Sequence, residues 1–160
     1  MEDQTLLELD EFKVSGTHLS QFVEKYEAFV SALSESEREK LQNFLTEKNE
    51  LHSSSRTTGV TCDCPGQSQC SCSTWLSECC ICWSSASHEG ACGSYASICF
   101  CRTAPKELAP ARFSDEEIFV KLNALNFREM FQFLINNNID IKPLKQAFSE
   151  LEKHALPLDN

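Results

Sequence analysis

The sequence predicts a mainly α protein, in which two helical hairpin-like flanks, packed together or dimerising, surround a cysteine-rich, irregular central insertion. Two observations support this class: all ten cysteines lie between Cys62 and Cys101, and the charge divides at nearly the same points. Residues 1–56 hold 12 acids and 6 bases, residues 57–104 hold three acids and one base, and residues 105–160 hold 9 acids and 7 bases. These ranges are the predicted N-terminal helical region, cysteine-rich segment and C-terminal helical region.

Apolar residues in the N-terminal region recur every three or four positions, as they do on one face of an α-helix. Thr17 is the expected N-cap of the first helix, and Ser34 with Glu37 has the pattern of a capping box that starts a second helix. A serine run then ends the second helix and begins a linker. The two apolar faces comprise Leu19, Phe22, Val23, Tyr26, Phe29, Val30 and Leu33, and then Leu41, Phe44 and Leu45.

The C-terminal region has the same character. A capping box at Ser114–Glu117 predicts a helix that continues through Leu125. A run of three asparagines ends a second helical segment, and Pro143 suits the first turn of a last helix. The expected apolar faces are Ile118, Phe119, Leu122 and Leu125, then Phe127, Met130, Phe131, Phe133, Leu134 and Ile135, and finally Leu144, Ala147, Phe148 and Leu151.

The aromatic residues on these faces predict either a core shared by the two flanks or a surface for another protein or for self-association. The net charge of -10 argues against nucleic acid and anionic membranes as partners. The first residues are acidic, unlike those of a secretory signal, and no segment approaches the roughly 20 apolar residues of a membrane span. We therefore expect a cytoplasmic protein whose thiols are kept reduced.

Metal binding is the leading hypothesis for the cysteine-rich segment, because thiolates bind zinc, Cu(I) and Fe–S clusters. Cys-x-Cys spacing occurs four times, and we expect it to point neighbouring sulfurs to opposite sides of an extended chain, where they serve different ions. Zinc is the expected ion, with Cu(I) and Fe–S clusters as alternatives. The candidate ligands are Cys62, Cys64, Cys70, Cys72, Cys79, Cys80, Cys82, His88, Cys92, Cys99 and Cys101. This spacing loosely resembles the nine-cysteine, three-zinc modules of the pre-SET and tesmin types.

Two other chemistries account for the same segment. Ten cysteines permit five disulfides, and the adjacent Cys79 and Cys80 are then expected to bond elsewhere rather than to each other. The density of Ser, Thr and Cys also suits a lanthionine- or thiazole-type peptide precursor with residues 57–103 as its core. Residues 9–15, LDEFKVS, resemble the L-D-x-x-x-V-S leader box of nisin-like lantibiotics, and Cys64-Pro65-Gly66 is similar to their Pro-Gly turn. Palmitoylation of the cysteine cluster is a further option.

Catalysis is not expected. Cys92 and His88 are close enough in sequence to form a nucleophile–base pair, but no Lys or Arg between Arg56 and Arg102 is present to lower a thiol pKa. The sequence therefore predicts a non-enzymatic zinc–thiolate protein with a helical scaffold for protein interaction. The alternatives are a modified-peptide precursor and a disulfide-stapled structural protein.

Overall fold

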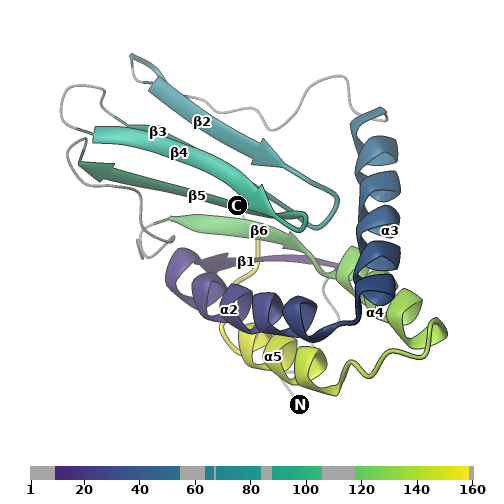
Figure 1. Cartoon of the computed structure of the whole chain (residues 1–160). Coiled ribbons are helices and arrows are strands. Elements are labelled where there is room, and N and C mark those ends of the chain that lie inside the picture. Colours follow the sequence, from purple (N-terminus) through teal and green to yellow (C-terminus); the bar gives the residue numbers. More distant parts are fainter. Residues whose placement is uncertain (1–9, 55–63, 67, 84–87, 106–117, 159–160) are drawn as a thin grey trace.

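The computed structural model describes residues 10–54, 64–66, 68–83, 88–105 and 118–158 (Figure 1). Its elements in chain order are β1 (Glu11–Ser15), α2 (Gly16–Ala32), α3 (Glu35–Ser54), β2 (Ser68–Ser73), β3 (Ser77–Trp83), β4 (His88–Tyr95), β5 (Ile98–Pro105), β6 (Phe119–Asn123), α4 (Ala124–Asn136) and α5 (Lys142–Glu152). The predicted mainly α class is wrong, because the described chain is mixed α/β with two antiparallel sheets.

The larger sheet has the strand order β1-β6-β3-β2, and the smaller sheet pairs β4 with β5. Strand β3 pairs with β6 at Ser77 and Glu78 and then continues into its pairing with β2. The cysteine-rich strands are therefore continuous with the sheet of the flanks. The expected irregular insertion is instead a set of paired strands.

Strands β1 and β6 were both missed by helical reasoning. In β1, Phe12 and Val14 are buried while their neighbours are half-exposed, which is the two-residue period of a strand. In β6, Val120 and Leu122 are fully buried between more exposed neighbours. The predicted helix through Leu125 is therefore wrong between positions 118 and 123, and the predicted capping box at 114–117 lies outside the described residues.

The helix ends are set by local polar side chains. Ser34 and Glu37 form the predicted capping box: Glu37 N donates to Ser34 Oγ at 3.1 Å, and Ser34 N donates to Glu37 Oε1 at 3.0 Å. Pro143 occupies the first turn of α5, as predicted. The predicted cap at Thr17 is wrong, because β1 runs directly into α2 and Ser15 caps that helix by accepting a hydrogen bond from His18 N.

The two flanks repeat one β-α-α order. In the β1–β6 register Lys13 lies opposite Lys121. A residue that follows Lys13 by some number of positions therefore has the same place in its flank as the residue that follows Lys121 by the same number. Ser15 thus corresponds to Asn123, and each accepts a hydrogen bond as the N-cap of the following helix. The second helix of each flank packs on the first helix of the other flank: α5 packs on α2, and Phe44 of α3 stacks on Phe133 of α4. The cysteine-rich strands separate these two related units.

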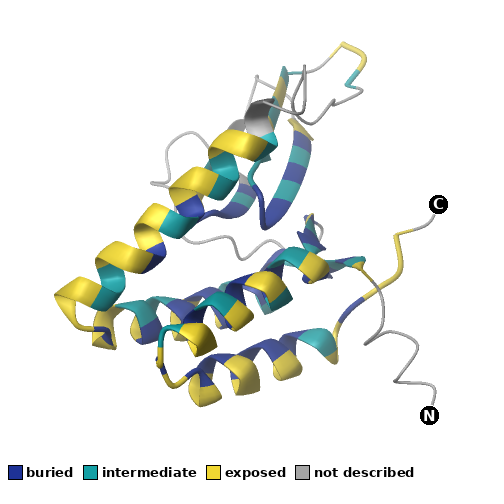
Figure 2. Cartoon of the chain, turned by 90° about the vertical axis from the view of Figure 1, so that its right-hand side faces the viewer, coloured by how far each residue is buried: buried dark blue, intermediate teal, exposed yellow. Residues whose placement is uncertain are grey.

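The core is formed by the flanks together. Aromatic rings from both flanks meet there, with Phe22 at 5.9 Å from Phe127 and 5.8 Å from Phe148 between ring centroids. Figure 2 shows buried and exposed stripes along the helices, and the aromatic residues predicted as a surface or a core are largely in the buried stripes. None of the described helices combines the length and apolar character needed to cross a lipid bilayer.

Candidate functional site: a disulfide-bonded double hairpin

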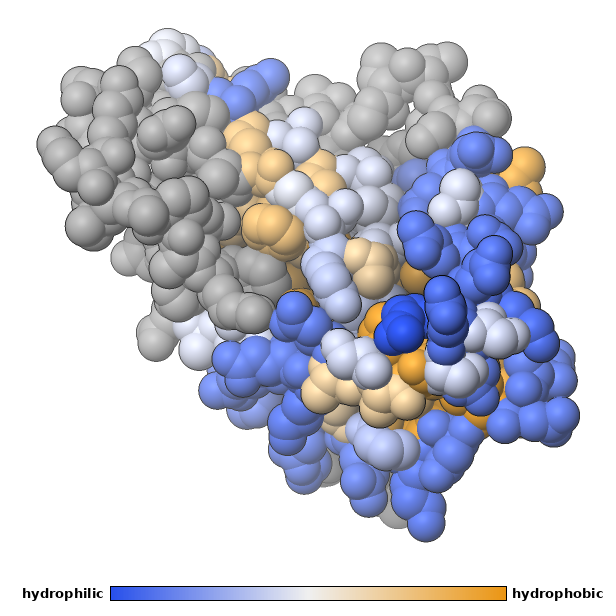
Figure 3. Space-filling view, viewed as in Figure 1, coloured by the Kyte–Doolittle hydropathy of each residue, from blue (hydrophilic) through white to orange (hydrophobic). Residues whose placement is uncertain are grey.

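Two β-hairpins, β2–β3 and β4–β5, form the double hairpin that contains the cysteines. Strand β2 lies against β4, and β3 lies against β5, so the hairpins pack on each other. The β4–β5 turn consists of Ala96 and Ser97, whose φ angles are 46° and 75°. Two successive positive φ angles are those of a type I′ turn, which fits the right-handed twist of a hairpin. In Figure 3 most of the strand surface that is not grey is pale or orange, whereas the surface over α3 is mostly hydrophilic.

Three disulfides join the two hairpins. Cys70 of β2 bonds to Cys92 of β4, with a Cα–Cα distance of 5.8 Å. Cys72 of β2 bonds to Cys99 of β5 at 5.8 Å, and Cys79 of β3 bonds to Cys101 of β5 at 6.2 Å. These separations lie in the ordinary range for disulfides. Every strand of the double hairpin is thus covalently tied to the opposite hairpin.

Further cysteines lie at the edge of the double hairpin. Cys64, just before β2, bonds to Cys82 near the end of β3, with a Cα–Cα distance of 5.6 Å. Cys80 is also disulfide-bonded, and no described cysteine has a free thiol. Cys62, which was predicted as a ligand, lies outside the described residues. The protein therefore contains a disulfide framework, as one of the alternative hypotheses expected.

The expected effect of Cys-x-Cys spacing is wrong. Side chains two residues apart in a strand share one face, because successive side chains alternate between faces. Cys70 and Cys72 accordingly bond to the same opposite hairpin, and Cys99 and Cys101 are both fully buried between the hairpins. Adjacent cysteines are the ones that diverge: Cys79 is buried at the interface, whereas its neighbour is more exposed and bonded elsewhere, as predicted.

The other candidate ligands are distributed unevenly. His88 is the first residue of β4 and lies opposite Pro105 in the strand register, away from the turn. The sulfur atoms of Cys70, Cys92 and Cys101 lie within 4.8 Å of one another, which is the geometry of a possible metal-binding cluster. Of the eleven predicted ligands, the described structure brings these three together and holds their sulfurs in disulfides.

The double hairpin is attached to the helices through its turns. Asn49 of α3 accepts a hydrogen bond from Trp75 N at 2.8 Å and donates one to Ser97 Oγ at 2.5 Å. Thr74 Oγ1 donates to the Ser97 carbonyl. Tyr26 of α2 donates to the Ala96 carbonyl at 2.9 Å. One amide of α3 therefore connects both hairpin turns, a role that the amino-acid sequence does not signal.

Burial strongly affects the tyrosine at this attachment. Tyr26 is fully buried, and burial, followed by the nearby Tyr95, raises the pKa of its hydroxyl well above the ordinary value. The pKa of Tyr95 is also raised, first by burial and then by Glu27, with Arg38 acting in the opposite direction. Their rings meet edge to face at 6.1 Å. Tyr26 is therefore a neutral hydrogen-bond donor over the physiological pH range.

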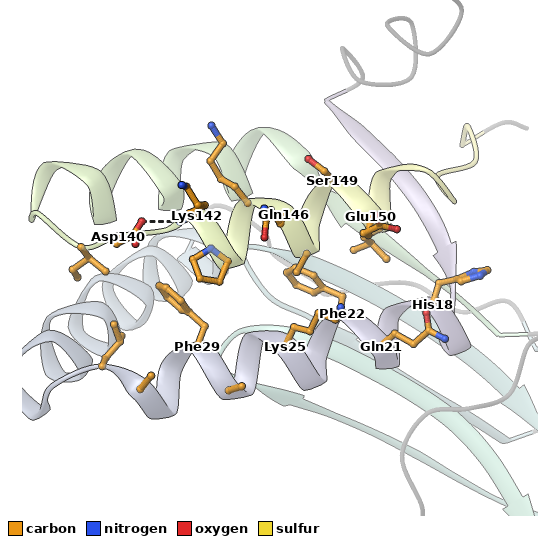
Figure 4. Close-up of a pocket in the computed structure, with 18 of the residues that line it drawn as sticks. His18, Gln21, Phe22, Lys25, Phe29, Asp140, Lys142, Gln146, Ser149 and Glu150 are labelled. Carbon is orange, nitrogen blue, oxygen red and sulfur yellow. Dashed lines mark hydrogen bonds between the residues drawn. The ribbon is translucent and has the colours of Figure 1, made fainter.

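A second feature is a groove of about 1450 Å³ between α2 and α5 (Figure 4). Phe22 and Phe29 project from α2 toward α5 and form part of its apolar lining. At one end the rings of His18 and His154 stack with centroids 3.6 Å apart. The charged and ionisable lining residues are His18, Lys25, Glu37, Asp140, Lys142, Lys145, Glu150, Lys153 and His154. Sequence reasoning did not find this groove, because it forms only when the two flanks pack.

Comparison with protein-family models, with curated proteins and with solved structures finds no match. The geometry of the double hairpin and of the groove therefore carries the functional argument.

Proposed function

We propose that this chain is a non-enzymatic, disulfide-stapled structural protein that works in an oxidising compartment and binds a protein partner through its helices. The observation that carries this proposal is the set of three disulfides between the two hairpins. Disulfides persist in secreted and other oxidising environments and are rare in the reducing cytosol. The expectation of a cytoplasmic location rested on the acidic first residues and on the lack of a long apolar segment, and the disulfides favour a different compartment.

The disulfides replace an apolar core in the double hairpin. Apart from cysteines, the described apolar side chains buried on its strands are Ile81 and Ile98, and few such residues cannot offset the cost of ordering four strands. The three bridges close segments of 22, 27 and 22 residues. A disulfide that closes a loop of this size stabilises the folded state by about 3 kcal/mol. The double hairpin thus depends on oxidation for its fold.

The bonding state of the sulfurs also supports a non-enzymatic role. A thiolate is the nucleophilic form of cysteine, and a sulfur held in a disulfide cannot act as one. Every described cysteine is bonded, including Cys92, the nucleophile considered from the sequence. The sulfurs accordingly serve to hold strands together.

The groove between α2 and α5 is the surface that fits a partner, and its chemistry favours an acidic peptide segment. Among the described residues, the ammonium groups of Lys25, Lys142 and Lys145 pair with no carboxylate. Two of the acids in the lining are already engaged, since Asp140 accepts from the Lys142 backbone N at 3.1 Å and Glu150 pairs with Lys153 at 3.2 Å. The lining has four lysines against three acids, and this small excess of positive charge beside apolar side chains favours acidic chains with apolar side chains.

The disulfide framework is tested on protein isolated from its own host with thiols alkylated at lysis. We expect almost no alkylation and an intact mass short of two hydrogens for each bridge. Peptide mapping without reductant should recover the pairs Cys64–Cys82, Cys70–Cys92, Cys72–Cys99 and Cys79–Cys101. Full alkylation would overturn the proposal, and loss of water from Ser and Thr would indicate the modified-peptide precursor instead.

The groove is tested with a short fluorescein-labelled peptide of Glu and Leu residues. We expect its fluorescence anisotropy to rise on binding and the affinity to fall with salt. The charge reversals K142E and K145E together should weaken binding about tenfold, because they invert the groove's charge. Lys40, exposed on α3 and outside the groove, provides the control variant K40E. Equal binding by all variants, or none by the wild type, would refute this partner.

A further inference from the structure

We propose that four sulfurs of the double hairpin form a zinc site when their two disulfides are reduced, so that the same strands are held either by disulfides or by one metal ion. The sulfurs are those of Cys70, Cys79, Cys92 and Cys101, here called the four-sulfur cluster. This inference rests on the proposed disulfide framework, because it adds a second state to the same residues.

The geometry of the cluster carries the proposal. Sulfur atoms of Cys70, Cys92 and Cys101 lie within 4.8 Å of one another, and the sulfur of Cys79 is bonded to that of Cys101. Zinc bound by four thiolates at about 2.3 Å places neighbouring sulfurs about 3.8 Å apart. The sulfur of Cys79 lies outside the 4.8 Å group but is bonded to one of its members, so it is the ligand that has to move when the ion binds.

The origin of the four ligands also suits a structural metal site. Each strand of the double hairpin contributes one of them: β2, β3, β4 and β5 carry Cys70, Cys79, Cys92 and Cys101 in turn. Cys79 and Cys101 are buried, and the other two are half-buried, which is the enclosure typical of a structural rather than a catalytic ion. One ion would therefore connect the same four strands that the two disulfides connect.

The conversion has a defined chemical balance. Two dithiol reductants each donate two electrons and two protons through a mixed disulfide, which breaks the Cys70–Cys92 and Cys79–Cys101 bonds and forms one disulfide in each reductant. The resulting four thiols bind Zn²⁺ as thiolates and release four protons. Two molecules of a small-molecule disulfide reverse the process: each accepts two electrons and two protons and becomes two thiols, the two protein disulfides form again, and the ion leaves.

The release of protons makes this exchange easy to observe. Zinc binds thiolates, so four thiols that bind one ion give up their protons, and proton release should accompany binding. Zinc affinity should consequently rise with pH.

The test uses the full chain, reduced with a non-chelating phosphine and titrated with zinc chloride under anaerobic conditions. We expect one zinc per chain by native mass spectrometry, together with proton release. Cobalt(II) in place of zinc should give thiolate charge-transfer absorption and the visible bands of tetrahedral coordination. Zinc should also restore protease resistance to residues 68–105 of the reduced chain, because it reconnects the four strands.

Paired variants separate the cluster from the other cysteines. C70S/C92S should lose the zinc and the cobalt spectrum, whereas C72S/C99S, which removes a neighbouring bridge between the same hairpins, should retain both. Equal retention or equal loss in the two variants would overturn the proposal. Failure of the reduced wild type to bind zinc, or its aggregation in the presence of zinc, would also overturn it, because the ion should replace the lost links.

The two proposals fail in distinguishable ways. Disulfides in the host-isolated protein combined with no zinc uptake after reduction would leave the structural function intact and refute the zinc site. Free thiols in the host-isolated protein would refute the disulfide-stapled function, and the zinc titration would still report on the cluster.

Discussion

Cys92 lies directly opposite Cys101 in the β4–β5 register, yet the two are not bonded to each other. Each bonds instead to the other hairpin, and the opposed pair Cys72 and Cys79 in β2–β3 behaves in the same way. Bonds within a hairpin would duplicate connections that backbone hydrogen bonds already make. Bonds between hairpins hold together two layers that otherwise share few apolar contacts, which is why the bridges determine the stability of this region.

Removal of the buried bridge should therefore cost more than removal of the peripheral one. C79S/C101S loses a cross-link between hairpins and buries two hydroxyls, so we expect a loss of at least about 3 kcal/mol in the free energy of unfolding. The bridge that C64S/C82S removes closes a loop of comparable length, but Cys82 is exposed, so the loss should be smaller. Urea unfolding followed by circular dichroism measures both. Equal losses would show that position within the double hairpin is unimportant.

Asn49 should act as a link between α3 and both hairpin turns. Asn49→Ala removes its hydrogen bonds to Trp75 and Ser97, and we expect a destabilisation of about 2 kcal/mol. Hydrogen exchange should increase at residues 74–76 and 96–98 before it increases in the helices. Asn43→Ala, at an exposed position of the same helix, controls for the change in helix propensity. Equal effects of the two substitutions would contradict this role.

The helices could be predicted from the sequence because their signals are local. The three- and four-residue spacing located α2 and α5, and the capping box at Ser34 set the start of α3. The short strands β1 and β6 could not be found in this way. Each contributes only two buried residues, so its two-residue period is short, and around β6 Ile118, Leu122 and Leu125 also recur at the four- and three-residue spacing of a helix.

The bonding state of the cysteines could not be predicted from the sequence for a different reason. The spacing of cysteines along the chain does not specify which sulfurs meet, because pairing depends on how the two hairpins pack. The contact of Asn49 with both turns and the groove between α2 and α5 likewise join segments far apart in sequence. The expected reducing environment also favoured metal over disulfides, and it rested on the acidic first residues and the lack of a long apolar segment, not on the cysteines themselves.

Glu152 should make stability fall as pH rises from acidic to neutral values. Burial raises the pKa of this carboxyl, and Arg128, at 4.0 Å, only partly opposes the effect. The folded chain therefore binds a proton more tightly than the unfolded chain does, and stability declines as pH rises from about 4 through the raised pKa. Glu152→Gln should gain stability relative to the wild type over this window in urea unfolding. Glu150→Gln, an exposed carboxylate on the same helix, should show no such gain.

Tyr26 should make stability fall at alkaline pH. Its pKa in the folded chain is raised by burial, whereas in the unfolded chain it ionises near pH 10. Above about pH 10 the unfolded chain loses a proton that the folded chain retains, so unfolding becomes easier as pH increases. Tyr26→Phe should lower the free energy of unfolding by about 1 kcal/mol near pH 8, because the hydrogen bond to the Ala96 carbonyl is lost. Above pH 8 the stability of this variant should decline less steeply with pH than that of the wild type. Guanidinium unfolding from pH 8 to 11 measures both slopes, and equal slopes would show that Tyr26 does not control the alkaline limit.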